Sequence, residues 1–264
     1  MLEVIDKGSC SQAHPVPLLF VHGGWHGAWC WDDHFLEFFA GAGYRAVALS
    51  LRGHGNSPTT KPIRSCSIAD YVDDVRATAD KLGGRPVLIG HSLGGFVVQR
   101  YLENHTAPAA VMVGSEPSQG VLGLALRVWR RHPWISIRAF AGSTSLEFIN
   151  TPALTREYLF CQHTPEAIVE SCMTRAGPES TRAAAIDPTF RRVKTRLVTT
   201  PMLVLGAEHD GFVSVSDVHA TARAYRTKPE FFSGMGHNMM LERAWADVAQ
   251  RIHTWLEARD LVSQ

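Results

Sequence analysis

The chain has 264 residues, 45% of them hydrophobic, with 26 basic and 25 acidic residues. This length suits one large domain and is too short for two full-sized enzyme domains. The balanced charge argues against nucleic acid or an anionic membrane as a partner, so we expect a small neutral substrate.

The cysteines and the N-terminus bear on the compartment. The five cysteines form an odd set without CxxC spacing, which favours reduced thiols over a disulfide framework or a zinc site. Residues 1–10 lack the basic start and the apolar core of a signal peptide, and no segment reaches the run of about 18 apolar residues that spans a membrane. We therefore expect a cytoplasmic protein without a membrane span, and its oligomeric state stays open.

Short apolar runs rich in β-branched residues predict buried strands. They lie at 17–21, 46–51, 86–89, 109–113, 201–205 and 230–232. Helical spacing appears between several of these runs, at 68–82, 96–104, 215–225 and 241–261. Alternating strands and helices predict an α/β fold with a doubly wound, mostly parallel sheet.

A glycine-rich turn, GHSLGG at 90–95, follows the third predicted strand and precedes a helical stretch. A serine on a sharp turn between strand and helix holds its hydroxyl clear of the sheet, and the flanking glycines remove side chains that would collide. The turn also presents backbone N–H groups at a helix N-terminus, where they stabilise an oxyanion. Ser92 is therefore the predicted nucleophile, against the alternative of a glycine-rich turn with an incidental serine.

The alternation of strand and helix stops at residues 116–200, which contain helical pieces but no convincing strand. We expect a helical cap there, inserted into a core formed by residues 1–115 and 201–264. Most apolar residues of the cap should pack onto the core, and a minority should face the substrate. The candidates for substrate contact are Trp25 in an early loop and, in the cap, Leu122, Leu126, Trp129, Phe140, Phe160 and Met173.

A serine nucleophile needs a base, and the chain has 13 histidines. His237 follows the last predicted strand and precedes the final helix. Loops at the carboxyl ends of parallel strands are where such a sheet collects its active site. We therefore predict His237 as the base, with an ordinary loop histidine as the alternative.

The base needs a carboxylate that accepts a hydrogen bond from its other ring nitrogen. Asp210 comes just after the strand at 201–205, and gives the chain order Ser, Asp, His that is typical of this arrangement. Glu208 is the nearest competitor but lies closer to the strand end, and Asp187 and Asp217 are weaker candidates.

The early loop HGGWHGAW at 22–29 is the place for the second oxyanion donor. We expect the donors to be the backbone N–H groups of Leu93, directly after the nucleophile, and of Gly24. His22 is expected to form structural hydrogen bonds rather than to carry protons.

These motifs resemble the α/β-hydrolase superfamily over nearly the whole chain. They are HGG at 22–24, RGHGNS at 52–57, GHSLG at 90–94, Asp210 and the Gly236-His237 pair. The stretch HGAWCW at 26–31 is similar to the branch that contains plant methylesterases and hydroxynitrile lyases. The resemblance implies that residues 52–57 form a structural turn.

The resemblance also narrows the chemistry, because this superfamily hosts many reactions. Epoxide hydrolases and haloalkane dehalogenases carry aspartate where this chain has Ser92, so those activities are disfavoured. Hydroxynitrile lyases use an early-loop threonine and a lysine after the histidine, where this chain has Gly24 and Asn238. Cofactor-free haloperoxidases share the same triad, and we expect that activity as a side reaction.

The expected function is a serine hydrolase that cleaves a carboxylic ester of a small apolar substrate through an acyl-enzyme on Ser92. A thioester, a lactone or a carbon–carbon bond next to a carbonyl is a lesser option. We expect no metal and no organic cofactor. The rival readings are a small-molecule receptor that keeps the triad and a catalytically dead scaffold.

Overall fold

Seven strands form one sheet in the computed structural model, which describes residues 1–141, 145–259 and 261, without the side chains of residues 140 and 141. The spatial order is β1-β3-β2-β4-β5-β6-β7. The strands are β1 Val4–Lys7, β2 Leu18–Val21, β3 Ala46–Leu49, β4 Val87–His91, β5 Ala110–Val113, β6 Met202–Ala207 and β7 Pro229–Phe232. The prediction of a doubly wound, mostly parallel sheet is confirmed.

β1 is the strand that the sequence analysis missed. It pairs antiparallel with β3, with Val4 opposite Leu49, at the edge of the sheet. Its four residues are half-buried or exposed, whereas β2 to β6 are buried along their whole length. A four-residue edge strand carries too little apolar sequence to be recognised, because the signal for a buried strand comes from burial on both faces.

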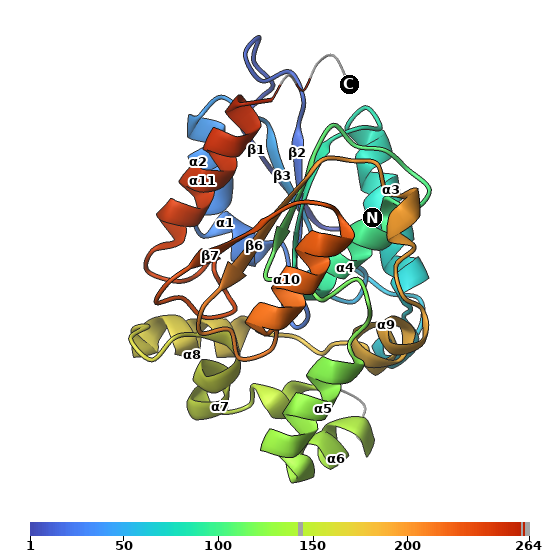
Figure 1. The fold of residues 1–264 in the computed structure, drawn as a ribbon, viewed down its shortest axis with the longest axis vertical. Coiled ribbons are helices and arrows are strands. Elements are labelled where there is room, and N and C mark those ends of the chain that lie inside the picture. The colour runs from blue at the N-terminus through green and yellow to red at the C-terminus, as the bar shows by residue number, and fades with distance from the viewer. Residues whose placement is uncertain (142–144, 260, 262–264) are drawn as a thin grey trace.

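Helices cover both faces of the sheet (Figure 1). On one face lie α1 Trp29–Asp32, α2 Phe35–Gly41 and α11 Trp245–Glu257, and on the other lie α3 Ile68–Lys81, α4 Ser92–Tyr101 and α10 Val215–Ala224. Ser67 caps α3 in a reciprocal capping box with Asp70, which satisfies free N–H groups of the first turn. Among the helices that the structure describes, none combines the length and the apolar character needed to cross a bilayer.

The α4 and α11 helices differ from their predicted bounds. α4 begins at Ser92, four residues earlier than expected, because Gly94 and Gly95 have poor helix propensity but are buried inside the first turn. α11 begins at Trp245 instead of residue 241 and ends at Glu257 instead of residue 261. In α4 packing overrides what the local sequence indicates.

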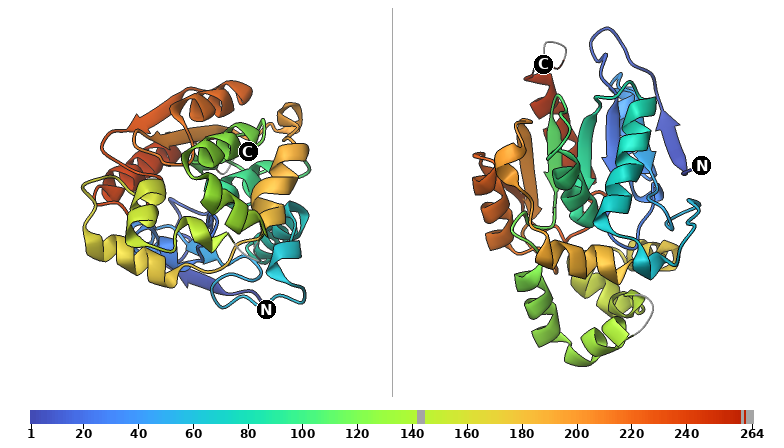
Figure 2. Two further views of the ribbon diagram at one scale, coloured as in Figure 1. Left: turned by 90° about the horizontal axis from the view of Figure 1, so that it is seen from below. Right: turned by 90° about the vertical axis from the view of Figure 1, so that its right-hand side faces the viewer.

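The segment between β5 and β6 is helical, and we call residues 116–200 the cap segment. Its helices are α5 Leu122–Arg131, α6 Pro133–Ala141, α7 Pro152–Leu159, α8 Glu166–Arg175 and α9 Asp187–Phe190. Short turns of 3-10 helix occur at Ile63–Ser65, Leu146–Phe148 and Thr195–Leu197, and a π-helical turn at Arg182–Ile186. Figures 1 and 2 show the cap segment across one end of the sheet.

Candidate active site

Ser92 lies at the junction of β4 and α4 in a conformation that favours glycine. Its φ is +51°, in the left-handed region that L-residues rarely adopt. The turn also lies very close to the segment that follows β2, since a Cβ added to Gly94 would collide with the carbonyl oxygen of His22. A non-glycine residue held in such strain, between glycines that cannot be replaced, is typical of a functional turn.

The structure brings Ser92, His237 and Asp210 together from three loops. His237 Nε2 lies 2.8 Å from Ser92 Oγ, and His237 Nδ1 lies 2.7 Å from Asp210 Oδ2. The side chains of His237 and Asp210 are 2% and 1% exposed. In this geometry the Nδ1–H of the imidazole donates to the carboxylate, and Nε2 is left to accept from the serine hydroxyl.

The other oxygen of Asp210 fixes the carboxylate in place. Oδ1 accepts hydrogen bonds from the backbone N–H groups of Phe212 and Val213 at 2.8 and 2.7 Å.

Among the described residues, the competing acids form no hydrogen bond with His237. Glu208 is exposed, and Asp217 caps α10 with Ser214 and pairs with Arg127. Asp187 accepts from the backbone of Ile68 and pairs with Arg182.

The early loop is oriented by His22. Its Nε2 accepts from the N–H of Leu51 at 3.0 Å, so Nδ1 carries the proton and donates to the carbonyl of Gly23 at 2.7 Å. The C=O and N–H of a planar trans peptide point in opposite directions, so this bond also orients the N–H of Gly24. Gly24 and Leu93, the two expected oxyanion donors, both line the same cavity as Ser92.

Two further histidines, which were not predicted from the sequence as site residues, support these loops. His26 Nδ1 donates to the carbonyl of Gly24 at 2.6 Å, and burial lowers the pKa of His26 to about 4, so the ring is neutral. His91 lies 3.0 Å from the carbonyl of His237 through Nε2. Both occur beside glycines in the motifs already noted, which is the signal that could have found them.

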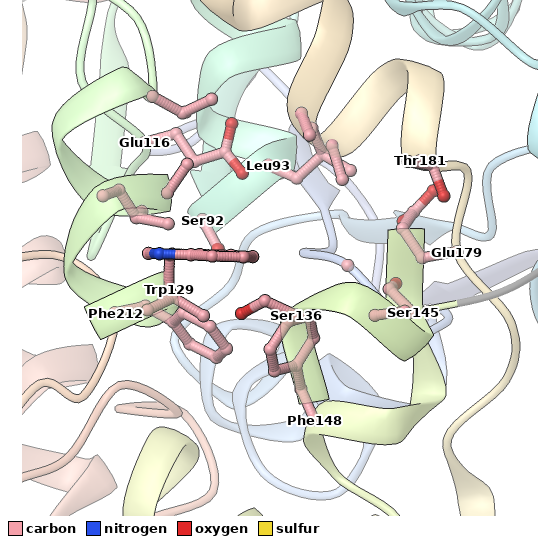
Figure 3. Close-up of a pocket in the computed structure, with 18 of the residues that line it drawn as sticks. Ser92, Leu93, Glu116, Trp129, Ser136, Ser145, Phe148, Glu179, Thr181 and Phe212 are labelled. Carbon is pink, nitrogen blue, oxygen red and sulfur yellow. The ribbon is translucent and has the colours of Figure 1, made fainter. Parts of the chain in front are cut away.

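A cavity of about 550 Å³ opens beside Ser92 and extends under the cap segment. Figure 3 shows Trp129, Phe148 and Phe212 around it, with Ser92 and Leu93 in its wall. Its apolar wall includes Trp25, Leu122, Leu126, Trp129, Phe148 and Phe212. Leu122, Leu126 and Trp129 are also partly exposed, so the cavity reaches solvent beside α5.

Three of the predicted substrate contacts do not appear in the described wall of this cavity. Phe160 is not among the described residues that line this cavity, so the expectation that Phe160 contacts the substrate is corrected. It is 4% exposed, and its backbone packs so closely on Gly236 that a Cβ at Gly236 would collide with it. The side chain of Phe140 lies outside the described residues. Met173, on α8, is likewise outside the cavity wall as far as the structure describes it.

A buried glutamate joins the cap segment to the loop that carries His237. Glu242 accepts from the backbone N–H groups of Cys161 and Gly236, at 2.7 and 3.0 Å, and from Thr164 Oγ1 at 2.6 Å. In addition, the N–H of Asn238 donates to the carbonyl of Leu159 at 2.8 Å. The segment after α7 therefore supports the position of His237.

A second buried glutamate joins the cap segment to the turn at residues 52–57. Glu179 Oε2 lies 3.0 Å from His54 Nε2, and Oε1 accepts from the hydroxyl of Tyr71 at 2.8 Å. Burial alone would lower the pKa of His54, but attraction to the Glu179 carboxylate and their hydrogen bond outweigh it and raise that pKa. The expected structural turn thus carries a buried ionic contact to the cap segment.

Fold and site together define an α/β protein with a Ser-His-Asp constellation at the carboxyl ends of its strands. A family model described as "Alpha/beta hydrolase family" matches residues 18–251. The chain belongs to the alpha/beta hydrolase family.

Curated relatives include the rice protein named "Probable esterase PIR7A" (Oryza sativa), 31% identical over 176 residues. That match covers 64% of this chain and 64% of the relative, so the chain spans just under two thirds of the relative's length. A "Non-heme chloroperoxidase" of Burkholderia pyrrocinia is 28% identical and covers 76% of this chain and 77% of its own. A solved thermophilic esterase of Thermogutta terrifontis is similar in fold, with a TM-score of 0.76, 20% identity and coverage of 97% and 93%.

Proposed function

We propose that this protein is a serine hydrolase that cleaves a carboxylic ester of a small, apolar substrate through an acyl-enzyme on Ser92. One observation carries the proposal: Ser92, His237 and Asp210 form a continuous chain of hydrogen bonds at the wall of an apolar cavity. The names of the esterase relatives support the same assignment.

In the acylation step His237 Nε2 takes the proton of the Ser92 hydroxyl while Oγ attacks the ester carbonyl. The Asp210 carboxylate stabilises the imidazolium that forms. The N–H groups of Gly24 and Leu93 donate to the oxyanion of the tetrahedral intermediate. His237 then gives its proton to the leaving alcohol as the intermediate collapses to the acyl-enzyme.

In the deacylation step His237 takes a proton from a water molecule, which attacks the acyl-enzyme. A second tetrahedral intermediate collapses, the proton returns to Ser92 Oγ, and the acid is released. The cavity walls at Trp129, Phe148 and Phe212 favour an apolar acyl or alcohol group.

All five cysteines are free thiols, which supports a cytoplasmic location as part of this proposal.

Perhydrolysis is a second candidate, because relatives carry the names "Non-heme chloroperoxidase" and "Bifunctional esterase/perhydrolase DCH" (Acinetobacter calcoaceticus). Here hydrogen peroxide replaces water as the attacking nucleophile and the acyl-enzyme yields a peracid. The peracid would then oxidise a halide in solution, so the same residues serve both reactions.

The first test is steady-state hydrolysis of p-nitrophenyl esters from acetyl to dodecanoyl by the parent protein and by Ser92→Ala. We expect multiple turnovers in the parent and a loss of about 10⁴-fold or more in Ser92→Ala, as for other triads. A folded parent protein without turnover on any ester would contradict the proposal. A ligand-dependent rise in melting temperature together with a single slow turnover would favour a receptor.

A second test distinguishes perhydrolysis from simple hydrolysis. Hydrogen peroxide and chloride or bromide are added to the same reactions, and oxidation of the halide is measured. Halide oxidation that needs both an ester or short carboxylic acid and Ser92 would support perhydrolysis. Halide oxidation that persists in Ser92→Ala would contradict it.

A further inference from the structure

Glu116 is a carboxylic acid in the wall of the apolar cavity, and the proposed mechanism does not use it. It lies just after β5, and its N–H donates to the carbonyl of Ser92 at 3.0 Å. Its own carbonyl accepts from Gln99 Nε2 at 2.9 Å and from Ser115 Oγ at 3.0 Å. The backbone of Glu116 is thus fixed next to the proposed nucleophile.

The side chain of Glu116 lacks such partners. The residue is 7% exposed, and its Oε2 is buried without a hydrogen-bond partner among the described residues. Buried polar atoms in folded proteins are nearly always hydrogen-bonded, because an unpaired one costs free energy. An unpaired carboxyl that lines a ligand-sized cavity is a group whose partner is expected to be a ligand.

The other polar side chains of the wall provide a comparison. Glu179 accepts from His54, from Tyr71 and from the N–H of Ser180. Ser145 Oγ accepts from Trp25 Nε1 at 2.9 Å. Figure 3 shows Glu116 beside Leu93 and Ser92, with Glu179 and Thr181 at a separate place on the wall. In contrast to Glu179, the buried Oε2 of Glu116 has no hydrogen-bond partner in the part of the chain that the structure describes.

The protonation state decides what Glu116 offers. Burial, reinforced by repulsion from Glu179, holds the pKa of Glu116 well above its usual range. Burial in the apolar wall thus favours the neutral acid, which has one O–H to donate. A neutral donor in an apolar cavity matches a neutral oxygen acceptor, whereas an ammonium group would have to lose its hydration to enter the same apolar walls.

We propose that Glu116 is a specificity-determining residue that donates a hydrogen bond to an ether, ketone or hydroxyl oxygen in the part of the ester substrate that fills the cavity. The preferred substrates are accordingly oxygen-bearing esters rather than plain alkanoates. This inference rests on the proposed esterase function. A site built to hydrogen-bond one substrate oxygen discriminates strongly against the analogue that lacks it.

The test compares p-nitrophenyl octanoate with analogues in which the methylene at C4, C5 or C6 is replaced by an ether oxygen or by a ketone carbonyl. The same comparison on the alcohol side uses heptyl acetate and 2-butoxyethyl acetate. For each pair, kcat/KM of the oxygen-bearing ester is divided by kcat/KM of the plain ester. This ratio in the parent is then divided by the same ratio in Glu116→Leu, which cancels the intrinsic reactivity of the esters. We expect a gain of about 10-fold or more for at least one oxygen position, the size of one hydrogen bond to a buried group.

Glu116→Gln is the matched control, because its amide keeps a neutral donor of nearly the same shape. It should retain the preference for the oxygen-bearing ester, while Glu116→Leu loses it. Retention of the preference in Glu116→Leu would overturn the proposal. A preference for amine-bearing esters that both variants abolish would also overturn it, because it would mean a charged carboxylate.

Two measurements do not depend on turnover. The melting temperature of Glu116→Leu should equal or exceed that of the parent, since the variant removes an unpaired buried polar group. Unfolding of this variant would show a structural role and overturn the proposal. In the parent, 2-octanone should raise the melting temperature more than 1-octene does, and this difference should disappear in Glu116→Leu.

These outcomes separate the two proposals. Failure to hydrolyse any ester, with the ketone still favoured over the alkene, would contradict the esterase function and leave the donor role of Glu116 supported. Hydrolysis of alkanoates without any Glu116-dependent preference would contradict only the donor role.

Discussion

His91 Nε2 donates a hydrogen bond to the carbonyl oxygen of His237 at 3.0 Å. Burial, reinforced by the neighbouring histidines, lowers the pKa of His91 well below its ordinary value, so the ring stays neutral. With the proton on Nε2, the other nitrogen Nδ1 is buried without a partner among the described residues. The residue before the proposed nucleophile thus holds the backbone of the proposed base.

Replacing His91 by Leu should impair this positioning. We expect kcat to fall about 10-fold with little change in KM, because His91 does not line the cavity. The carbonyl of His237 would lose one of its two donors and keep the N–H of Met239 at 2.9 Å, which should lower the free energy of unfolding by about 0.5–1.5 kcal/mol. Steady-state kinetics and denaturant unfolding measure both effects.

His91→Gln, which can still donate, should recover part of kcat. The exposed His219, replaced by Gln, is the matched control and should change neither quantity. A rise in KM without a fall in kcat would argue against a positioning role.

Asp210→Asn should leave the fold intact, because its carbonyl oxygen can still accept from Phe212 and Val213. Its amide would face Nδ1 of His237 and favour the wrong tautomer, so we expect kcat to drop about 10⁴-fold. Hydrolysis of p-nitrophenyl acetate and the melting temperature are the readouts. The exposed neighbour Glu208, replaced by Gln, should retain activity, and equal losses in the two variants would contradict the assignment of Asp210.

Trp129→Ala should lengthen the acyl chain that is hydrolysed fastest. The indole is 46% exposed and forms part of the cavity wall, so its removal widens the cavity without opening the core. The melting temperature should change little for the same reason. Trp134, 76% exposed on α6 and outside the described wall, is the control, and Trp134→Ala should keep the parent's chain-length profile.

The ionic contact between His54 and Glu179 should make stability depend on pH. The pKa of His54 is raised in the folded protein, so its contribution is fully present below the unfolded pKa of about 6.5 and disappears as the pH rises through the folded pKa. The difference in unfolding free energy between the parent and His54→Gln should therefore shrink as the pH is raised from below about 6.5 to above the folded pKa of His54. Denaturant unfolding from pH 5 to 10 measures it, and a difference independent of pH would contradict the ionic contact.

The parts of the site that the sequence predicted are those carried by local motifs. Ser92 and Asp210 follow buried strands and His237 follows the half-buried β7, and strands of a parallel sheet bring their carboxyl ends together. Glu116 also follows a buried strand but stands in none of the recognised motifs, and Glu179 lies in the cap segment, away from any strand. Their neighbours come from distant segments, so their surroundings become visible only once the chain is folded.

The same distinction explains the cap segment. The sequence predicted helical pieces in the cap segment, of which α5 is one, but it does not say which apolar residues face a cavity and which pack on the core. Leu126 and Phe160 are equally apolar in the sequence. The first lines the cavity and the second supports the loop of His237, because the turn after α7 is bound to Glu242.

Much of the described cavity wall comes from α5, α6 and the turn at 145–148, whereas the proposed reacting groups follow strands of the sheet. Mutations in those helices can therefore alter what is bound without disturbing how the bond is broken. Such a division favours rapid divergence, in which related genes exchange substrate preference while keeping one chemistry. For protein engineering it makes residues 121–148 the natural region for a focused library.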